Sequence, residues 1–226
     1  MFLSNRVHAP LVKVGLVLNG ESPSRHDLEQ LEDCQEIVCA DGAARHLLKA
    51  NKIPSVIVGD LDSLDPEVYK WVDAMSIPLE RHPRDKDYTD GELALQAALK
   101  HEPDQLVIIG GHGGRSSMFM ANLKILRRAH DAGVDATMMG RGETLRYVDE
   151  GEDLDLSDLH GATFNVLPIG GDAVVTIQGA QFEGERIELR GASARGVSNI
   201  VDKEGPARVE THEGLALVII ESDPDQ

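Results

Sequence analysis

Short apolar runs alternate with amphipathic stretches from the N-terminus to about residue 140, and this alternation predicts βαβ units. In such units a parallel sheet carries helices on both faces, and ligands bind beyond the carboxyl ends of the strands. The expected strands are residues 11–19, 36–40, 54–60, 76–80, 104–111 and 134–140. The expected helices are residues 25–34, 43–51, 89–101 and 117–133.

The pattern changes after Gly142, where short runs, several of them alternating, are separated by Gly, Asp and Pro. No long stretch of helical period remains, which predicts a small antiparallel β domain, a sandwich or a partial barrel. We therefore expect an α/β fold with a Rossmann-like parallel sheet over residues 1–142, followed by a β-sandwich over residues 143–226. The acidic segment 149–161 is expected to be a solvated loop.

The composition excludes several classes of protein. The chain has 226 residues and a formal net charge of -17, which disfavours nucleic acid as a partner. Cys34 and Cys39 form neither a CxxC motif nor a disulfide framework. We find no apolar run long enough to span a bilayer and no signal peptide in residues 1–20. These features predict a cytoplasmic protein that does not bind a membrane.

Acidic residues follow the expected strand 54–60 in the sequence "VIVGDLDSLDP". A solvated turn would explain them, and so would a site for a divalent cation. If the backbone stays extended, Asp60 and Asp62 point the same way and both carboxylates face one ion.

A second acidic group, in "RDKDYTDGELAL", precedes the next expected helix. Thr89 and Glu92 fit a capping box, so the helix should start at Thr89 with Asp90 in its first turn. A helix-start charge explains Asp90 well, but it explains Asp87 less well and Lys86 not at all. Two acidic groups at one edge of the sheet indicate a shared Mg²⁺ site, because Mg²⁺ binds one or two carboxylates and the phosphate oxygens of a substrate.

A Gly-rich turn, "GGHGGR", joins an expected strand to an expected helix. Glycines let backbone N–H groups approach a phosphate, the helix N-terminus adds a positive field, and Arg115 offers a bidentate donor. The turn matches neither GxGxxG nor a Walker loop. Asn19-Gly20 and Asp41 also end strands at this edge, although a turn and an N-cap would explain them as well.

Other motifs favour ordinary explanations. His82 and His112 are interpreted as surface histidines. The segment "GASARG" lacks the second glycine of a nucleophile elbow, which makes a serine hydrolase improbable. From composition alone, Ser198-Asn199 is interpreted as a turn.

Taken together, "LNGE", "ADGAARHL", "PSVIVGDLDSL", "KDYTDGELAL", "GGHGGR…MANL" and "GVSN" resemble the thiamine pyrophosphokinase family over nearly the whole chain. The resemblance implies a homodimer that transfers pyrophosphate from ATP to the hydroxyl of thiamine and releases AMP. It implies thiamine near Ser198 and Asn199, between the β domain and a partner subunit.

The resulting site assignment combines the residues with this resemblance. The expected metal ligands are Asp60, Asp62 and Asp87, with Asp90 and Arg115 as further catalytic residues. The expected ATP-binding residues are Asn19, Gly20, Asp41, Gly42, Lys86, Gly111, Gly113, Gly114 and Arg115.

The chain departs from the family pattern after the glycines. Where that pattern reads Gly-Gly-Arg-x-Asp-His, Ser117 and Met118 replace the acid and the imidazole. Ala43 stands where a second glycine is usual, and no Phe, Tyr or Trp follows Phe182. Three alternatives therefore stay open: a pyrophosphokinase for another alcohol, a nucleotide-binding protein without turnover, and a metal-dependent phosphohydrolase.

Overall fold

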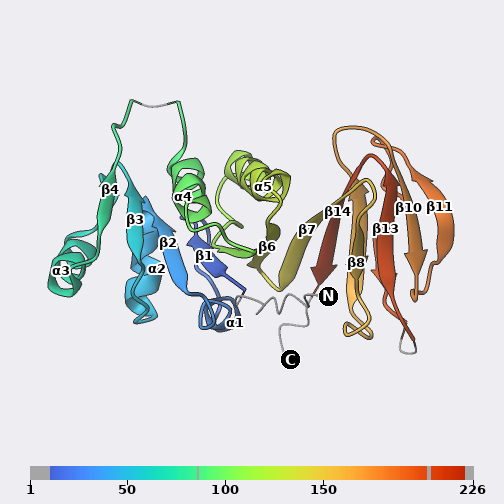
Figure 1. Cartoon of the computed structure of the whole chain (residues 1–226), viewed down its shortest axis with the longest axis horizontal. Helices are drawn as coiled ribbons and strands as arrows, with labels where there is room; N and C mark the ends of the chain where they lie inside the picture. The colour runs from blue at the N-terminus through green and yellow to red at the C-terminus, as the bar shows by residue number, and fades with distance from the viewer. Residues whose placement is uncertain (1–10, 86, 203–204, 222–226) are drawn as a thin grey trace, which may run out of the picture.

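A computed structural model describes residues 11–85, 87–202 and 205–221 (Figure 1). The helices are α1 (Arg25–Glu29), the 3₁₀ helix η1 (Asp41–Ala43), α2 (Ala44–Lys49), α3 (Pro66–Met75), α4 (Asp90–Leu99) and α5 (Ser116–Asp131). The first strands are β1 (Lys13–Val17), β2 (Glu36–Ala40), β3 (Val56–Gly59), β4 (Leu79–Arg81), β5 (Gln105–Ile109), β6 (Asp135–Gly140) and β7 (Glu143–Asp149). The later strands are β8 (Asp153–Asp155), β9 (Thr163–Pro168), β10 (Ala173–Gln178), β11 (Gly184–Leu189), β12 (Asn199–Ile200), β13 (Arg208–Glu213) and β14 (Leu215–Glu221).

The described strands form a large sheet in the order β12-β9-β14-β7-β6-β5-β1-β2-β3-β4 and a smaller one in the order β11-β10-β13-β8. Strands β1 to β6 pair in parallel. The chain runs outward from β1 to β2, β3 and β4 and then returns to β5 on the other side of β1. This reversal makes a switch point between β1 and β5, where open α/β sheets bind ligands.

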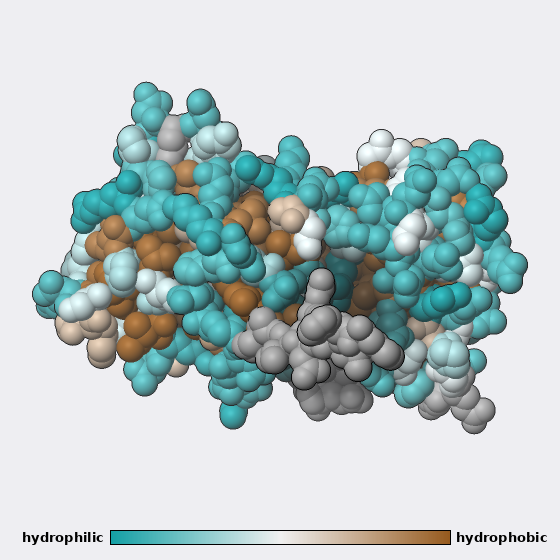
Figure 2. Space-filling view, in the orientation of Figure 1, coloured by the Kyte–Doolittle hydropathy of each residue, from teal (hydrophilic) through white to brown (hydrophobic). Residues whose placement is uncertain are grey.

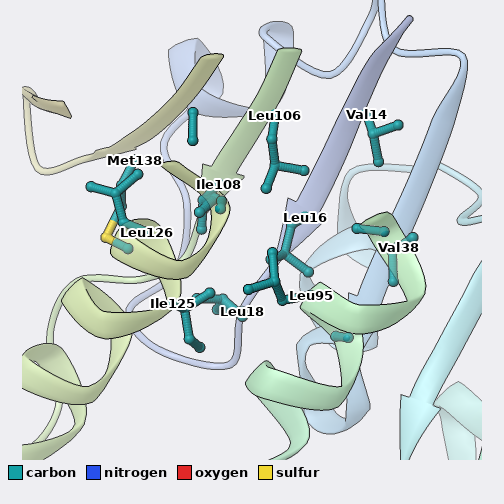
Figure 3. Close-up of a cluster of buried hydrophobic side chains, with 14 of the residues drawn as sticks. Val14, Leu16, Leu18, Val38, Leu95, Leu106, Ile108, Ile125, Leu126 and Met138 are labelled. Atoms are coloured by element: carbon teal, nitrogen blue, oxygen red, sulfur yellow. The ribbon is translucent and has the colours of Figure 1, made fainter. Parts of the chain in front are cut away.

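Helices cover both faces of the parallel part, as expected from the sequence. Helices α4 and α5 pack on one face against apolar side chains from β1, β2, β5 and β6 (Figure 3). Helices α2 and α3 cover the other face, where Trp71 packs among the alternate side chains of the same strands. Adjacent residues such as Leu16 and Val17 therefore belong to different cores, because successive side chains in a strand point to opposite faces.

The large sheet continues into the β-sandwich without a break in its hydrogen bonding. Strand β7 pairs antiparallel with β6, and β14 and β9 follow. The smaller sheet packs on this extension around Phe164 and Val218. The α/β part, coloured blue to green, and the sandwich, coloured yellow to red, thus share one sheet (Figure 1).

Local signals place several helix ends. Ser24 and Asp27 form a capping box at α1, as Thr89 and Glu92 do at α4, where the prediction is confirmed. Helix α3 begins with Pro66, a residue suited to a first helical turn. The expected helix 25–34 ends early, at Glu29, and the expected acidic loop 149–161 contains strand β8.

Hydrophilic side chains cover most of the visible face of the sandwich, while apolar residues show between the helices of the α/β part (Figure 2). Within the described part of the chain, we find no helix long and apolar enough to cross a membrane.

Candidate active site

A cleft of about 570 Å³ opens at the carboxyl edge of the parallel strands, on the switch point between β1 and β5. The predicted site residues that line it are Asn19, Gly20, Asp41, Asp60, Asp90, Gly113, Gly114 and Arg115. The chain brings these residues together from five segments, four that follow β1, β2, β3 and β5 and one that begins α4. A shared cleft is what the sequence argument requires of them.

Three carboxylates meet in or beside this cleft. One oxygen from each of Asp41, Asp60 and Asp62 lies within 4.8 Å of the other two. Asp41 opens η1 after β2, while Asp60 and Asp62 follow the neighbouring strand β3. Parallel pairing of β2 and β3 therefore sets the distance between the groups. Carboxylates this close repel one another unless a cation or a proton neutralises them.

Asp41 is the most enclosed of the three, with 5% of its surface exposed. Its Oδ2 accepts a hydrogen bond from the Ser63 hydroxyl, whereas its buried Oδ1 has no hydrogen-bond partner within the described residues. Burial raises the pKa of the Asp41 carboxyl, the Ser63 hydrogen bond lowers it, and the charges of Asp90 and Asp60 raise it again. The sequence analysis assigned Asp41 to ATP and missed its position among the carboxylates.

A left-handed turn, and not an extended strand, brings Asp60 and Asp62 together. Strand β3 ends at Gly59, and Leu61 has φ 65°. The Asp62 N–H donates to Asp60 Oδ1 at 3.1 Å, and the Tyr69 hydroxyl donates to the Leu61 carbonyl at 2.8 Å. The expectation of extended backbone was wrong, but the two carboxylates still converge. Strain of this kind gathers at functional sites.

Asp90 lines the cleft at the start of α4, close to Asp41. A Cβ added at Gly59 would come within 3.1 Å of Asp90 Oδ1 and 2.7 Å of the Asp41 Cβ. Gly59 therefore leaves the space in which these two side chains approach each other. Asp87 is exposed and belongs neither to the group of three carboxylates nor to the lining of the cleft. Lys86 lies outside the described residues.

The Gly-rich turn forms the third wall. Gly110, Gly113 and Gly114 have φ between 66° and 77°, a region that glycine adopts readily. The turn leads directly into α5. Arg115 is exposed and is the N-cap residue of this helix. Gly111 does not line the cleft. Its carbonyl accepts a hydrogen bond from Asn122 Nδ2 at 2.8 Å, which ties the turn to α5.

The loop after β1 packs directly on this turn. The Gly20 N–H donates to the Gly110 carbonyl at 2.9 Å. A Cβ on Gly20 would lie 2.4 Å from that oxygen, so only glycine fits there. Asn19 accepts a hydrogen bond from Arg45, and Gly42 packs so closely that its Cβ would meet Asn19 Nδ2 at 2.7 Å. Gly42 shapes the loop without lining the cleft.

Ser198 and Asn199 are not brought to the cleft within this chain. Asn199 is buried at the edge of the sandwich, where its amide bonds the backbone N–H and carbonyl of Phe182 at 2.9 and 2.8 Å. Ser198 is exposed with φ 59°, and its N–H donates to Asn165 Oδ1.

Sequence reasoning gave no role to several residues that the structure places in the cleft wall. Arg84, Tyr88 and Asn122 line it. Arg84 also lies 3.4 Å from Asp62. Its position two residues before Lys86 in an acidic loop was an available signal.

The interpretation of His112 as a surface histidine was wrong, because 4% of the residue is exposed. His82 is partly buried and lies 3.1 Å from Glu80.

Comparisons with known proteins point to one family. A family model described as "Thiamin pyrophosphokinase, catalytic domain" matches residues 28–138. A thiamine pyrophosphokinase of Bacillus subtilis is 29% identical over 106 residues, which cover 47% of this chain and 50% of that protein. A second match, Thiamine pyrophosphokinase 1 of rice, is 26% identical over 112 residues, with 40% and 42% covered. The alignments thus span half or less of these two relatives.

Solved structures extend the similarity to the whole fold. The Bacillus subtilis thiamine pyrophosphokinase superposes with a TM-score of 0.82 at 22% identity and covers 93% of this chain and 99% of that one. A thiamin pyrophosphokinase family protein of Enterococcus faecalis gives a TM-score of 0.78 at 26% identity, with the same coverage. The expected α/β fold with a second, antiparallel sheet is confirmed by these neighbours.

Proposed function

The chain belongs to the thiamine pyrophosphokinase family, and on that premise we propose that it transfers pyrophosphate from ATP to the hydroxyl of thiamine and releases AMP. The observation that carries the proposal is the group formed by Asp41, Asp60 and Asp62, which faces the Gly-rich turn across one cleft. The carboxylate group suits a cation, and the Gly-rich turn suits phosphate. Pyrophosphate transfer needs both a cation and a phosphate site.

The carboxylate group fits Mg²⁺. All of its donors are carboxylate oxygens, which Mg²⁺ prefers, and the buried Oδ1 of Asp41 lacks a hydrogen-bond donor within the described residues. Asp41, Asp60 and Asp62 would hold the ion. When bound, Mg²⁺ would neutralise charge on the phosphates. The geometry favours Asp41 over Asp87 as the third ligand, and a role for Asp87 stays a prediction.

The other residues of the cleft would position the nucleotide. The N–H groups of Gly113 and Gly114, the N-terminus of α5 and the Arg115 guanidinium would bind phosphate oxygens. Asn19 and Gly20, in the loop after β1, would also contact the nucleotide, because this loop packs against the Gly-rich turn. This positioning would fix the β-phosphorus in line with the acceptor hydroxyl, which lowers the free-energy barrier to the transfer.

Asp90 is our candidate for the group that takes the hydroxyl proton. It is a carboxylate of the cleft that lies outside the group of three possible metal ligands. A carboxylate can accept the proton as the oxygen attacks phosphorus.

The acceptor alcohol would bind between two copies of the chain. Ser198 and Asn199 lie away from the cleft, so a partner subunit is required if they contact thiamine. Exposed apolar side chains next to them, Phe182, Val197 and Ile200, support an interface there. We therefore propose a homodimer. A monomer by light scattering that is active at nanomolar concentration would contradict this.

The domain boundary and the location of the protein are proposals. The division at residues 142 and 143 stays a prediction, since β6 and β7 pair across it. A cytoplasmic location also stays a prediction.

One observation favours a second candidate function, a nucleotide-binding member with little turnover. Met118, which stands in place of the family's imidazole, lines the cleft with a thioether that can neither donate nor accept a proton. ATP binding without AMP formation would distinguish this candidate.

The metal site is tested with Asp60→Asn and Asp62→Asn. Both variants should fold and should lose Mg²⁺-dependent turnover, because these side chains are not part of the core. Asp65→Asn is a matched control, since Asp65 precedes α3 and its side chain makes no capping hydrogen bond. Mg²⁺-dependent activity retained in both site variants would overturn the proposal.

A further inference from the structure

The imidazole of His112 is buried, although it belongs to the Gly-rich turn and the residues from Gly114 to Met118 are exposed. Only 4% of the residue is accessible, and neither ring nitrogen has a hydrogen bond within the described residues. Nε2 lies 3.5 Å from Glu143 Oε2, which is beyond good hydrogen-bond geometry. Buried polar groups are nearly always paired, so this ring calls for an explanation.

His112 connects the turn to three other segments. Its carbonyl accepts a hydrogen bond from the Glu21 N–H at 2.7 Å, in the loop after β1. Its ring lies 5.2 Å from the Phe119 ring of α5. It also packs on the end of β6, before the β6–β7 turn, where a Cβ added at Gly140 would be 2.7 Å from Nδ1. A movement of the ring would thus be transmitted to both the phosphate turn and the start of the sandwich.

Charged groups from four surrounding segments act on the ring. Burial lowers the pKa of the His112 imidazole, the carboxylates of Glu143, Asp27 and Glu21 raise it, and Arg141 lowers it. Glu143 comes from β7, Asp27 from α1, Glu21 from the loop after β1, and Arg141 from the β6–β7 turn. These opposing effects make the ring sensitive to one additional negative charge.

We propose that His112 is a positioning residue of the nucleotide site, which takes up a proton from the solvent when a polyphosphate binds on Gly113 and Gly114. The inference rests on the function proposed above. Phosphate oxygens at the turn favour the imidazolium form, which has two N–H donors in place of one. The Nε2–H can then form an ion pair with Glu143 and hold the turn against the β6–β7 turn in its phosphate-binding form.

Proton uptake links nucleotide affinity to pH. Because the complex binds more protons than the free protein, Mg·ATP binding should weaken as pH rises through the pKa of His112 in the complex. The slope is at most about tenfold per pH unit for one proton.

The test is titration calorimetry of Mg·ATP at pH 7 in two buffers that differ in ionisation enthalpy. The difference in heat gives the protons taken up. The wild-type protein should take up a fraction of a proton that His112→Gln does not. His101→Gln, at an exposed site after α4, should behave as the wild type. Protonation of the nucleotide itself is common to all three proteins and cancels.

A second variant keeps the inference testable if His112→Gln fails to fold. Glu143→Gln removes the proposed partner but retains the ring, so the pH dependence of binding should move to lower pH. Proton uptake in His112→Gln equal to that of the wild type, or a pH profile unchanged in Glu143→Gln, would overturn the role of His112 alone. Absence of any Mg·ATP binding by the wild-type protein would overturn the proposed function and this inference together.

Discussion

The Ser63 hydroxyl donates a hydrogen bond to Asp41 Oδ2 and so joins the turn after β2 to the loop after β3. The bond occupies Oδ2 and leaves Oδ1 without a hydrogen-bond partner among the described residues, in a carboxyl group that lies beside those of Asp60 and Asp62. Ser63 thereby orients one carboxylate of the proposed metal site, as outer-shell residues do in metalloproteins.

Ser63→Ala should weaken Mg²⁺ activation by about 10-fold or more, since loss of an outer-shell partner has effects of that size. The measurement is turnover as a function of Mg²⁺ concentration. Ser63→Thr retains the hydroxyl and should retain most of the affinity. Equal Mg²⁺ dependence in Ser63→Ala and the wild type would show that the hydrogen bond does not orient Asp41.

Asp41→Asn should stabilise the metal-free protein at pH 7 while abolishing turnover. An acid whose pKa is raised on folding binds its proton more tightly in the folded state. Folding stability therefore falls as pH rises from the ordinary Asp value of about 3.9 through the raised pKa. Asparagine cannot ionise and removes this loss, so we expect the variant to have the larger free energy of unfolding at pH 7.

The gain should disappear below about pH 4, where the wild-type carboxyl is protonated in both states. The stability difference between the variant and the wild type is measured by urea denaturation in the presence of EDTA, from below about pH 4 to pH 7. A variant that is less stable than the wild type at pH 7 would contradict the account in which burial and neighbouring charges raise the pKa of Asp41.

Arg115→Lys should lower kcat/KM for ATP by about 10-fold or more with little change in stability. Lysine keeps the charge but cannot bind two phosphate oxygens as a planar fork does. Arg115 is exposed, so its replacement leaves the core intact. Arg25→Lys, in an exposed ion pair on α1, is the control. The measurement is steady-state kinetics with varied ATP concentration. Equal effects of Arg115→Lys and Arg25→Lys on kcat/KM would exclude a contact between Arg115 and phosphate.

The double change Ser117→Asp, Met118→His should increase thiamine-dependent AMP release. Both residues are exposed at the start of α5, so the fold should tolerate the substitutions. A missing catalytic contact can lower the rate by about 10²-fold or more. If the unaltered protein is fast and the double variant slower, a nearby acid such as Asp85 or Asp41 has taken over the role.

Local sequence signals predicted local structure well. The capping box of Thr89 and Glu92 and the alternation of strands and helices need only neighbouring residues, and both are confirmed. The cleft could be predicted because parallel strands place their carboxyl ends at one edge.

Features that depend on distant segments were missed. Asp41 joins the carboxylate group through the pairing of β2 with β3, and His112 is buried by α5 and the end of β6. The left-handed backbone at residue 61 could not be predicted, because the position holds leucine and not the glycine or asparagine that usually adopts this conformation. The side-chain amide of Asn199 forms hydrogen bonds with the backbone of Phe182, and local sequence patterns cannot predict a contact between residues this far apart in the chain.

The most direct test of the account follows the β-phosphorus of labelled ATP, in the presence of Mg²⁺, with and without thiamine. We predict that AMP and labelled thiamine diphosphate form together in equal amounts, and that neither forms without thiamine or in Asp60→Asn. Release of ADP or phosphate at the same rate whether or not thiamine is present would contradict the proposed pyrophosphate transfer.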